Sequence, residues 1–430
     1  TDKKLVILNR LRGRISERQD FLNSPFFENM QKRGCSLIGN PVIIYQMDTR
    51  KKRNNVHRRI HAVLAILAGP FLRGLYAFHY PKETPVQGPF LLVANHVTAA
   101  DPVLLALAQK HTMLYFVASE HLMQKGVGSK ILRFLYEPIV RRKGDTAVTT
   151  VKEMLATLKA GLNVGVFPEG TCSFNGTNSP FLPTIGKLAR AAKCSLVTYR
   201  FEGGFFTLPR WGKGIRRGDY YGHTVRVYPP DELKTMTDAE INAHIEEDLN
   251  ENAYARIRMQ PVRYRSRHRA ELLESAYFLC PKCRRVGTIR TKGDRIRCDC
   301  GLDAALDAQY TLSGMPYETL IDWDADQTAW LEAAAQAPGF EFSDENVTLE
   351  RNDDAHRRET LGKGTMRMTR ERFSVGAREF ALSDISNMEL VRRNLLVFST
   401  HDAHYQARGV PSLNSRKYML LYRIWKGATT

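Results

Sequence analysis

The sequence has no uninterrupted apolar stretch of the roughly 20 residues that a helix needs to cross a bilayer. The best candidate, residues 60–72, is shorter and contains Gly69 and Pro70. The chain also lacks a secretory signal, an internal repeat and a low-complexity tract, and four of its seven cysteines are clustered late in the sequence. These absences argue against a secreted disulfide framework or a solenoid, and they favour several globular domains in a reducing cytosol.

Basic residues are in strong excess, and the net charge is +18 at pH 7. Such a balance predicts an anionic partner, either phosphate groups, a coenzyme, an anionic membrane surface or nucleic acid. A basic run over residues 50–59 leads into the short apolar stretch at 60–72, and this pattern suits a helix that lies in the membrane interface. The alternative is a helix buried against the domain that follows.

The first residues of the chain are basic and poorly patterned. Residues 1–60 hold 14 basic and 5 acidic side chains, which accounts for half of the positive excess. The chain does not begin with Met, and Met47, which precedes a basic run, is a plausible start of the protein. We therefore expect residues 1–56 to be a basic N-terminal extension of uncertain role.

From residue 89 onward, short apolar runs alternate with amphipathic runs. Strands are predicted over residues 91–94, 113–118, 138–140, 164–167, 196–199 and 223–228. Apolar side chains at helical spacing predict a helix over residues 146–160, and a capping box at Thr237–Glu240 predicts another that runs to about residue 255. The alternation predicts an α/β domain with a mixed sheet flanked by helices.

A histidine and an aspartate, His96 and Asp101, lie between the first of these strands and the next helix. Pro102 suits the first position of that helix, and Asp101 before it suits the N-cap. A loop that turns back would bring the imidazole and the carboxylate together, so that one ring nitrogen is fixed and the other is free as a base. The spacing alone also fits a loop histidine beside a capping aspartate.

Two further motifs follow strands at the expected edge of the sheet, where ligands bind in open α/β folds. Phe167-Pro168-Glu169-Gly170-Thr171 presents a carboxylate, a glycine suited to a sharp turn and a hydroxyl. Arg141 and Arg142 come directly after the strand at 138–140 and suit a phosphate. Each motif alone is also compatible with an ordinary turn or an exposed charged face.

Taken in order, the three motifs resemble those of the glycerolipid acyltransferase family, whose members acylate glycerol 3-phosphate, lysophosphatidate and lysophospholipids. The resemblance covers roughly residues 57–260. It implies a glycerol-3-phosphate acyltransferase-like fold in which His96, oriented by Asp101, is the general base that deprotonates the acceptor hydroxyl. The acyl donor would be acyl-CoA or acyl-carrier protein, with no redox cofactor. The substrate-binding residues implied by the motifs are Asn95, Arg141, Arg142, Glu169, Gly170 and Thr171.

The sequence departs from the family pattern at the acceptor end of the site. The family commonly has Arg then Ser after the Thr, whereas this chain has Cys172 and Ser173. Arg200 or the loop arginines Arg210, Arg216 and Arg217 are candidates to supply the missing cation. The departure keeps three alternatives open: a non-phosphate acceptor, thioester hydrolysis, and a catalytically silent adaptor.

A second kind of site follows the predicted acyltransferase domain. The cysteines form two knuckles with the spacing of a structural zinc ribbon, at Cys280, Cys283, Cys298 and Cys300. The second knuckle is Cys-x-Cys rather than Cys-x-x-Cys. Four thiolates at such a spacing predict one closed tetrahedral zinc ion, without which a ribbon of this size does not fold.

We therefore predict four parts: an extension at 1–56, an acyltransferase domain at 57–265, a zinc ribbon at 270–306, and an α+β domain at 307–430. The last part is rich in short strands and resembles a pleckstrin-homology-like or GRAM-like module. The predicted partners are a lipid membrane surface and the acyl donor, and nucleic acid is not expected. The predicted location is the cytoplasmic face of a membrane, peripherally or interfacially bound. The oligomeric state is not predicted.

Overall fold

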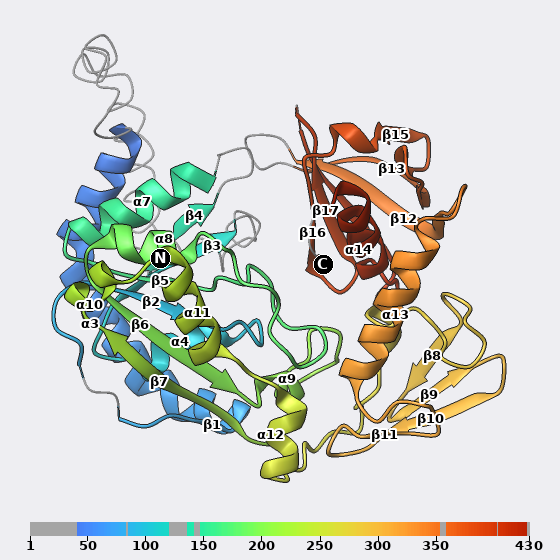
Figure 1. Cartoon of the computed structure of the whole chain (residues 1–430), viewed down its shortest axis with the longest axis horizontal. Helices are drawn as coiled ribbons and strands as arrows, with labels where there is room; N and C mark the ends of the chain where they lie inside the picture. Colours follow the sequence, from blue (N-terminus) through green and yellow to red (C-terminus); the bar gives the residue numbers. More distant parts are fainter. Residues whose placement is uncertain are drawn as a thin grey trace, which may run out of the picture. The chain divides into compact units, whose positions relative to one another are not determined.

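The computed structural model describes residues 41–82, 85–119, 136–141, 147–352, 358–401 and 403–427. The chain divides into two compact units, residues 1–55 and 56–430. In the second unit the described strands form three sheets, which follow one another along the chain (Figure 1). The predicted helix at 119–135 and the side chain of Arg142 lie outside the described residues.

The first sheet carries the predicted α/β domain, and it is a mixed sheet as predicted. Its strand order is β1-β7-β6-β2-β5-β3-β4. The strands are β1 (Phe78–His79), β2 (Phe90–Ala94), β3 (Leu114–Ser119), β4 (Ile139–Arg141), β5 (Asn163–Val166), β6 (Ser195–Glu202) and β7 (Tyr220–Tyr228). From β6 to β4 the neighbours are parallel, and only β7 runs antiparallel to β6. The carboxyl ends of β6, β2, β5, β3 and β4 therefore meet at one edge of the sheet.

The central strands are apolar on both faces because helices cover the sheet. All five residues of β2 are buried. The helices of this part are α4 (Asp101–Ala108), α7 (Ala147–Lys159), α8 (Ile185–Ala192), α9 (Gly204–Thr207), α10 (Pro230–Thr235), α11 (Asp238–Leu249) and α12 (Ala253–Met259). The predicted capping box is confirmed at α11, but the helix ends at Leu249, and Asn252 caps a separate helix α12.

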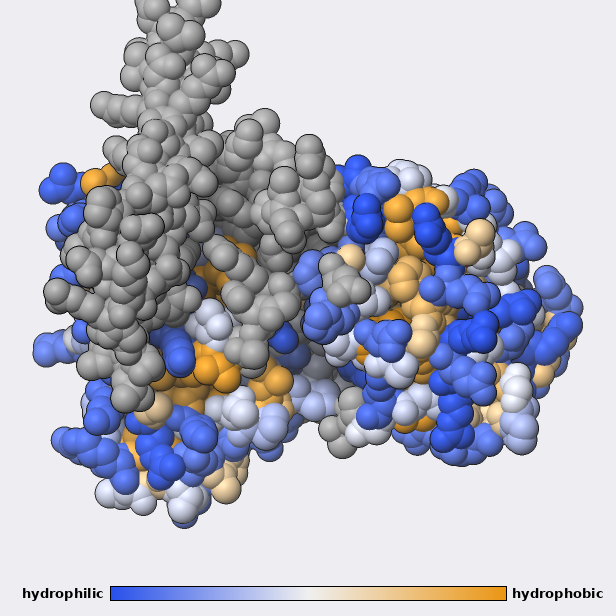
Figure 2. Space-filling model, turned by 90° about the horizontal axis from the view of Figure 1, so that it is seen from above, coloured by the Kyte–Doolittle hydropathy of each residue, from blue (hydrophilic) through white to orange (hydrophobic). Residues whose placement is uncertain are grey.

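Helix α3 (Pro41–Tyr76) contains the predicted short apolar helix and extends beyond it at both ends. Figure 2 shows apolar side chains at the surface among polar ones on the face seen from above. On α3 the exposed apolar side chains are Val56, Val63, Ile66, Leu67 and Phe71. Their spacing places most of them on one side of the helix. Among the described residues, no helix combines the length and apolar content needed to cross a membrane.

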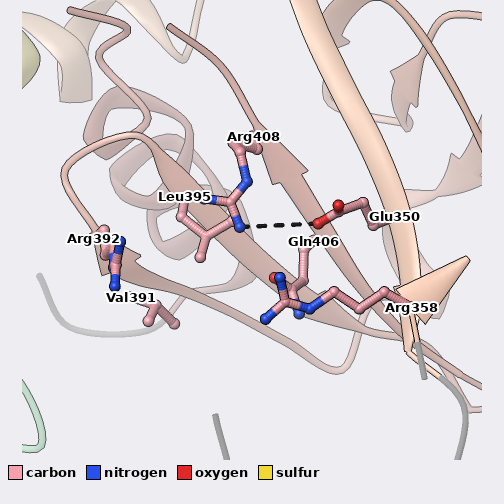
Figure 3. Close-up of a pocket in the computed structure, with 7 residues that line it drawn as sticks. All are labelled: Glu350, Arg358, Val391, Arg392, Leu395, Gln406 and Arg408. Atoms are coloured by element: carbon pink, nitrogen blue, oxygen red, sulfur yellow. Dashed lines mark ion pairs between the residues drawn. The ribbon is translucent and has the colours of Figure 1, made fainter. Parts of the chain in front are cut away.

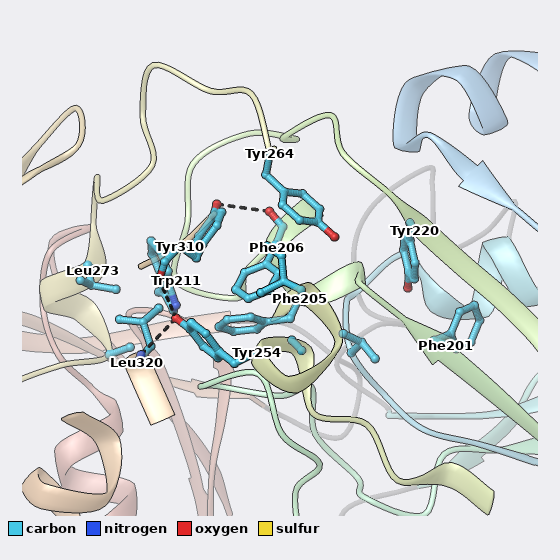
Figure 4. Close-up of a cluster of buried hydrophobic side chains, with 14 of the residues drawn as sticks. Phe201, Phe205, Phe206, Trp211, Tyr220, Tyr254, Tyr264, Leu273, Tyr310 and Leu320 are labelled. Carbon is cyan, nitrogen blue, oxygen red and sulfur yellow. Dashed lines mark hydrogen bonds between the residues drawn. The ribbon is translucent and has the colours of Figure 1, made fainter. Parts of the chain in front are cut away.

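The second sheet continues the hydrophobic core of the first. It has the order β11-β10-β9-β8 and comprises β8 (Ile289–Lys292), β9 (Arg295–Cys298), β10 (Leu302–Leu306) and β11 (Leu312–Ser313). Figure 4 shows aromatic side chains from both parts meeting, with the hydroxyl of Tyr310 donating to the carbonyl of Phe206 at 3.2 Å. Tyr254 donates to the carbonyl of Tyr310 and accepts from the N–H of Leu320. The two sheets are thus joined by packing rather than by a free linker.

The third sheet is antiparallel, with the order β15-β14-β13-β12-β18-β17-β16. Its strands are β12 (Phe342–Asn352), β13 (Arg358–Met368), β14 (Arg372–Val375), β15 (Arg378–Ala381), β16 (Asn387–Arg392), β17 (Leu395–Ser399) and β18 (His404–Arg408). Helix α13 (Leu320–Ala334) precedes the sheet, and α14 (Arg416–Lys426) follows it and packs against β16 and α13 (Figure 1). Two single-turn 3-10 helices, Leu273–Ser275 and Leu382–Asp384, complete the described elements.

A buried ion pair ties the last helix to the first domain. Arg416 donates two hydrogen bonds to Asp324, at 2.6 and 2.9 Å, and both side chains are about 7% exposed. Asp324 also accepts from the side-chain amide of Asn175 at 2.9 Å, and the Arg416 guanidinium lies 4.3 Å from the ring centroid of Phe174. Because Phe174 and Asn175 follow Cys172 closely, the C-terminal part contacts the loop that continues from the third motif.

Candidate active site

The loop between β2 and α4 brings His96 and Asp101 together, as the spacing predicted. Nδ1 of His96 lies 2.9 Å from Oδ2 of Asp101. A carboxylate oxygen accepts, so the ring proton lies on Nδ1 and Nε2 faces away from Asp101 as the free ring nitrogen. The His96 side chain is 18% exposed and that of Asp101 is fully buried. The arrangement is that of a base with an orienting carboxylate.

The carboxylate of Asp101 is saturated with donors. It accepts from the backbone N–H of Val97 at 2.6 Å, and from the N–H and hydroxyl of Thr98 at 2.9 and 2.6 Å. The phenol of Tyr220 on β7 also donates to it. Burial, followed by the charge of Asp101, raises the pKa of Tyr220 well above its ordinary value, so that the phenol stays protonated and donates. These contacts hold the carboxylate rigidly beside His96.

One sequence prediction about Asp101 is wrong. The residue is not the N-cap of the helix, because α4 begins at Asp101 and Ala100 occupies the cap position. The carboxylate instead turns back and binds the N–H groups of Val97 and Thr98 in the preceding loop. Asp101 thereby closes the loop that carries His96, and Pro102 is in the first turn of the helix as predicted.

The third motif is fastened to the first by Glu169. Its carboxylate accepts from the backbone N–H of His96 at 2.7 Å, the N–H of Ser179 at 2.7 Å and the side-chain amide of Asn178 at 3.1 Å. Burial raises the pKa of Glu169 to about 7, although these donors oppose the shift. Gly170 has a φ of +66°, which a residue without Cβ adopts at low cost in this tight turn. The sequence predicted substrate binding for Glu169, whereas the structure shows it occupied by backbone donors.

Asn95 is also occupied within the protein. It is fully buried, and its amide accepts from the N–H of Phe201 at 2.6 Å and donates to the carbonyl of the same residue at 2.8 Å. The contacts tie the end of β2 to β6. Phe167 stacks on the His96 ring with centroids 4.5 Å apart. Asn95 and Phe167 therefore position the histidine from two sides.

Cys172 lies at the other ring nitrogen of His96. Its Sγ is 3.5 Å from Nε2, and the cysteine is partly exposed. Burial lowers the pKa of His96, but Cys172 and Asp101 together outweigh it and raise the pKa well above the ordinary value. The sequence marked Cys172 only as a departure from the family pattern, and no signal in the sequence placed it against His96.

A cation does reach the third motif, and it is Arg210. Its guanidinium donates to the hydroxyl of Thr171 and to the backbone carbonyl of Leu390 on β16, and it lies 4.5 Å from the ring centroid of Phe174. The other candidate arginines have contacts elsewhere. Those contacts are to Asp248 and Glu202 for Arg200, to backbone carbonyls of His268 and Arg269 for Arg216, and to the carbonyl of Gly74 for Arg217.

Arg141 lies at the carboxyl end of β4 and is exposed. That strand is three positions from β2 in the sheet order, which at about 4.8 Å per strand is roughly 14 Å. The structure thus brings Arg141 to the same edge as His96, but not into the cluster around it. Its neighbour Arg142 is outside the described residues.

The four predicted metal ligands converge. The sulfur atoms of Cys280, Cys283, Cys298 and Cys300 all lie within 4.8 Å of one another. Cys280 and Cys300 are 3.7 Å apart, and Cys283 and Cys298 are 3.8 Å apart. Bonds of about 2.3 Å to a tetrahedral zinc ion give sulfur separations of roughly 3.8 Å. The donor set and its size therefore fit a single metal ion.

A hollow of about 290 Å³ lies in the third sheet, outside these sites (Figure 3). Three arginines and one glutamate line it, namely Arg358, Arg392, Arg408 and Glu350. Arg408 and Glu350 approach to 3.9 Å. None of the site residues predicted from the sequence lines this hollow.

Comparisons with known proteins bear on the first sheet. Residues 76–202 match the model of the Acyltransferase family. The comparison with curated proteins gives no match. The chain is similar to the crystal structure of the 1-acyl-sn-glycerophosphate (LPA) acyltransferase PlsC from Thermotoga maritima, at 17% identity over 53% of this chain and 90% of that chain, with a TM-score of 0.40. We build no argument on a likeness of that degree. The family match and the ordered motifs inside it identify residues 76–202 as an acyltransferase domain, and the chain as an O-acyltransferase of the glycerolipid acyltransferase family.

Proposed function

We propose that the protein moves a fatty acyl group from acyl-CoA or acyl-carrier protein to a hydroxyl of lysophosphatidate or a related glycerol phosphate or lysophospholipid. The observation that carries the proposal is the pair His96 and Asp101, with Nδ1 held at 2.9 Å by a buried carboxylate and Nε2 on the open side. His96 accepts the proton of the acceptor hydroxyl as its oxygen attacks the thioester carbonyl. Asp101 keeps the ring oriented and stabilises the imidazolium that forms.

Arg210 supports an acceptor that carries phosphate. The guanidinium has five N–H donors, and its contacts to Thr171 and Leu390 leave others for an anion. It takes the place of the cation that the family pattern has at the position of Cys172. A non-phosphate acceptor is the alternative, and the same cysteine motivates it. A catalytically silent adaptor is opposed by the intact His96 and Asp101 pair.

Replacement of the base tests the reaction. We expect His96→Ala to lower kcat/KM by roughly 10²–10⁴, because that is the usual contribution of a positioned general base. The measurement uses labelled acyl-CoA or acyl-carrier protein with a panel of lysophospholipid, glycerol phosphate and uncharged glycerolipid acceptors. His111→Ala, which removes an exposed histidine, is the matched control.

The products separate the alternatives. An ester that depends on the acceptor and disappears in His96→Ala supports the transfer reaction. Release of free fatty acid in all acceptor mixtures would replace it with thioester hydrolysis. Unchanged starting material with every donor and acceptor would leave the adaptor role.

Removal of the Arg210 guanidinium tests the acceptor class. We expect Arg210→Ala to raise KM for a phosphate-bearing acceptor roughly 10–100-fold, since a charged hydrogen bond contributes about 1.5–3 kcal/mol, and to leave KM for the acyl donor nearly unchanged. Arg217→Ala, an exposed arginine of the same loop, is the control. Equal effects of the two variants, or an equal loss with an uncharged acceptor, would contradict a phosphate-binding role.

We further propose that the protein works at a membrane surface that faces the cytoplasm, bound peripherally through α3. The support is the exposed apolar side of this helix, where Ile66, Leu67 and Phe71 are 68–73% exposed, with the exposed Arg58 and Arg59 one to two turns earlier. Apolar side chains enter the acyl boundary while basic ones bind anionic headgroups. The scattered cysteines suit a reducing compartment.

A vesicle assay tests this anchor. Because burying a Leu or Phe side chain is worth about 1.5–3 kcal/mol, we expect Leu67→Glu or Phe71→Glu each to weaken binding to phosphatidylglycerol–phosphatidylcholine vesicles at least tenfold. Met259→Glu changes an equally exposed apolar residue on α12 and should bind as the unmodified protein does. Co-sedimentation gives the bound fraction, and equal binding of all variants would rule out this face of α3.

We also propose that Cys280, Cys283, Cys298 and Cys300 hold one structural zinc ion as thiolates. The ion would brace a small sheet whose core is continuous with that of the catalytic domain. The boundaries of the four predicted parts, and the pleckstrin-homology-like character of the last, remain proposals. The antiparallel order of the third sheet and its closing helix α14 support the latter.

Metal analysis tests the zinc site. Elemental analysis of the purified protein should find about one zinc per chain, and Cys283→Ser should lose it and lower the melting temperature, because a ribbon without metal loses its main cross-link. Cys194→Ser, a change at a buried cysteine outside the cluster, should keep the metal. Full-strength folding of the protein after complete chelation would contradict a structural ion.

A further inference from the structure

Three side chains in the active site form a line of a thiol, an imidazole and a carboxylate. Sγ of Cys172 lies 3.5 Å from Nε2 of His96, and Nδ1 of the same ring lies 2.9 Å from Oδ2 of Asp101. A nucleophile beside a base, with the base oriented by a third group, is the geometry of covalent catalysis on unrelated folds. In this chain a cysteine occupies the position at which the family commonly has an arginine.

The sulfur is held in place by the backbone on both sides of it. The N–H of Ser173, the next residue, donates to the carbonyl of His96 at 3.0 Å. On the other side, the tight turn at Gly170 and the carboxylate of Glu169 fix the start of the motif against the His96 N–H. The thiol and the imidazole therefore belong to one braced unit, not to two loops that meet by chance.

The surroundings of the sulfur suit a nucleophile. Cys172 and His96 are both partly exposed, so an acyl thioester can reach them. The Arg210 guanidinium interacts electrostatically with Cys172, and His96 lies on another side of the sulfur. Positive groups beside a cysteine stabilise the thiolate that attacks. The other cysteine outside the metal cluster, Cys194, is buried, and burial raises its pKa to about 11.

From this arrangement we infer that Cys172 is a catalytic nucleophile, which carries the acyl group as a thioester between the donor and the acceptor. The inference deepens the function proposed above and rests on it. The reaction then has two half-reactions at one site, and His96 serves both. Donor and acceptor need not be bound at the same time.

In the first half-reaction His96 Nε2 takes the proton from Cys172 as Sγ attacks the carbonyl carbon of the donor thioester. The new bond is between Sγ and that carbon, and the bond from the carbon to the donor sulfur breaks. The proton on His96 moves to the leaving thiolate of coenzyme A or the carrier. One thioester is exchanged for another, so that no oxidant or further reactant is required.

In the second half-reaction the acceptor hydroxyl gives its proton to His96 as its oxygen attacks the acyl group on Cys172. The ester bond forms, the bond to Sγ breaks, and the thiolate of Cys172 recovers the proton from His96. Acylation also prepares the base. Cys172 is a main cause of the raised His96 pKa, and an acylated sulfur has no charge to hold a proton on the ring. The histidine is thereby neutral when the acceptor arrives.

Trapping the intermediate tests the inference. We incubate the full-length protein with labelled palmitoyl-CoA or palmitoyl-carrier protein without acceptor, quench it, and measure the intact mass and the modified peptide. We expect one hydroxylamine-sensitive acyl group at Cys172, which a chase with lysophosphatidate converts into ester. Initial rates over both substrates should give parallel double-reciprocal lines.

Variants make the test specific. Cys172→Ala should lose the label and lower acceptor acylation at least 100-fold, whereas Cys194→Ala should keep both. Cys172→Ser keeps a side chain that can bond His96, and its acyl ester should form slowly and persist longer, which guards against a folding defect in the alanine variant. His96→Ala should prevent labelling at Cys172.

The outcomes separate this inference from the proposed function. Ester formation by Cys172→Ala at near the unmodified rate, with intersecting kinetic lines and no labelled Cys172, would overturn the nucleophile and leave direct transfer by His96. A labelled Cys172 that releases only free fatty acid with every acceptor would uphold the nucleophile and overturn acyl transfer to a lipid. Absence of both label and ester would overturn both.

Discussion

The buried carboxylate of Asp101 is the constraint on which the site depends. It collects His96 Nδ1, the backbone of Val97 and Thr98, and the phenol of Tyr220, a residue 119 positions away. An unpaired carboxylate at this depth would be costly, so every donor must be present for the loop to keep its form. The same contacts set the tautomer of His96 and direct Nε2 to the place where Cys172 lies. Fold and chemistry are thus fixed by one group.

Local patterns in the sequence predict most of the first domain. The strand–helix alternation, the capping box at Thr237 and the approach of His96 to Asp101 depend on neighbours within a few residues, and the structure has all three. The helix predicted to about residue 255 breaks in two because Asn252 offers its side chain to the N–H groups that follow, a local preference that apolar periodicity does not register.

Contacts between distant residues account for what the sequence does not predict. Tyr220 reaches Asp101 because β7 reverses beside β6, and Arg210 reaches Thr171 because the loop after β6 returns over the site. Glu169 and Asn95 have the residue types of ligands, yet both are occupied by backbone groups. In a single sequence, a polar residue that binds substrate and one that braces a loop look the same, and only the packing of the strands separates them.

Arg210 spans from Thr171 to the carbonyl of Leu390, and this has a consequence for the order in which the chain becomes competent. Synthesis runs from the N-terminus, and domains generally fold as they emerge. Residues 76–202 can form the His96 loop early, but the carboxylate of Asp101 lacks one donor until Tyr220 is made. The guanidinium of Arg210 has its full set of contacts only after β16 is synthesised. A nascent or truncated chain is therefore an incomplete enzyme even when its family-matched residues are folded, and the last forty residues decide when the acceptor end of the site is finished.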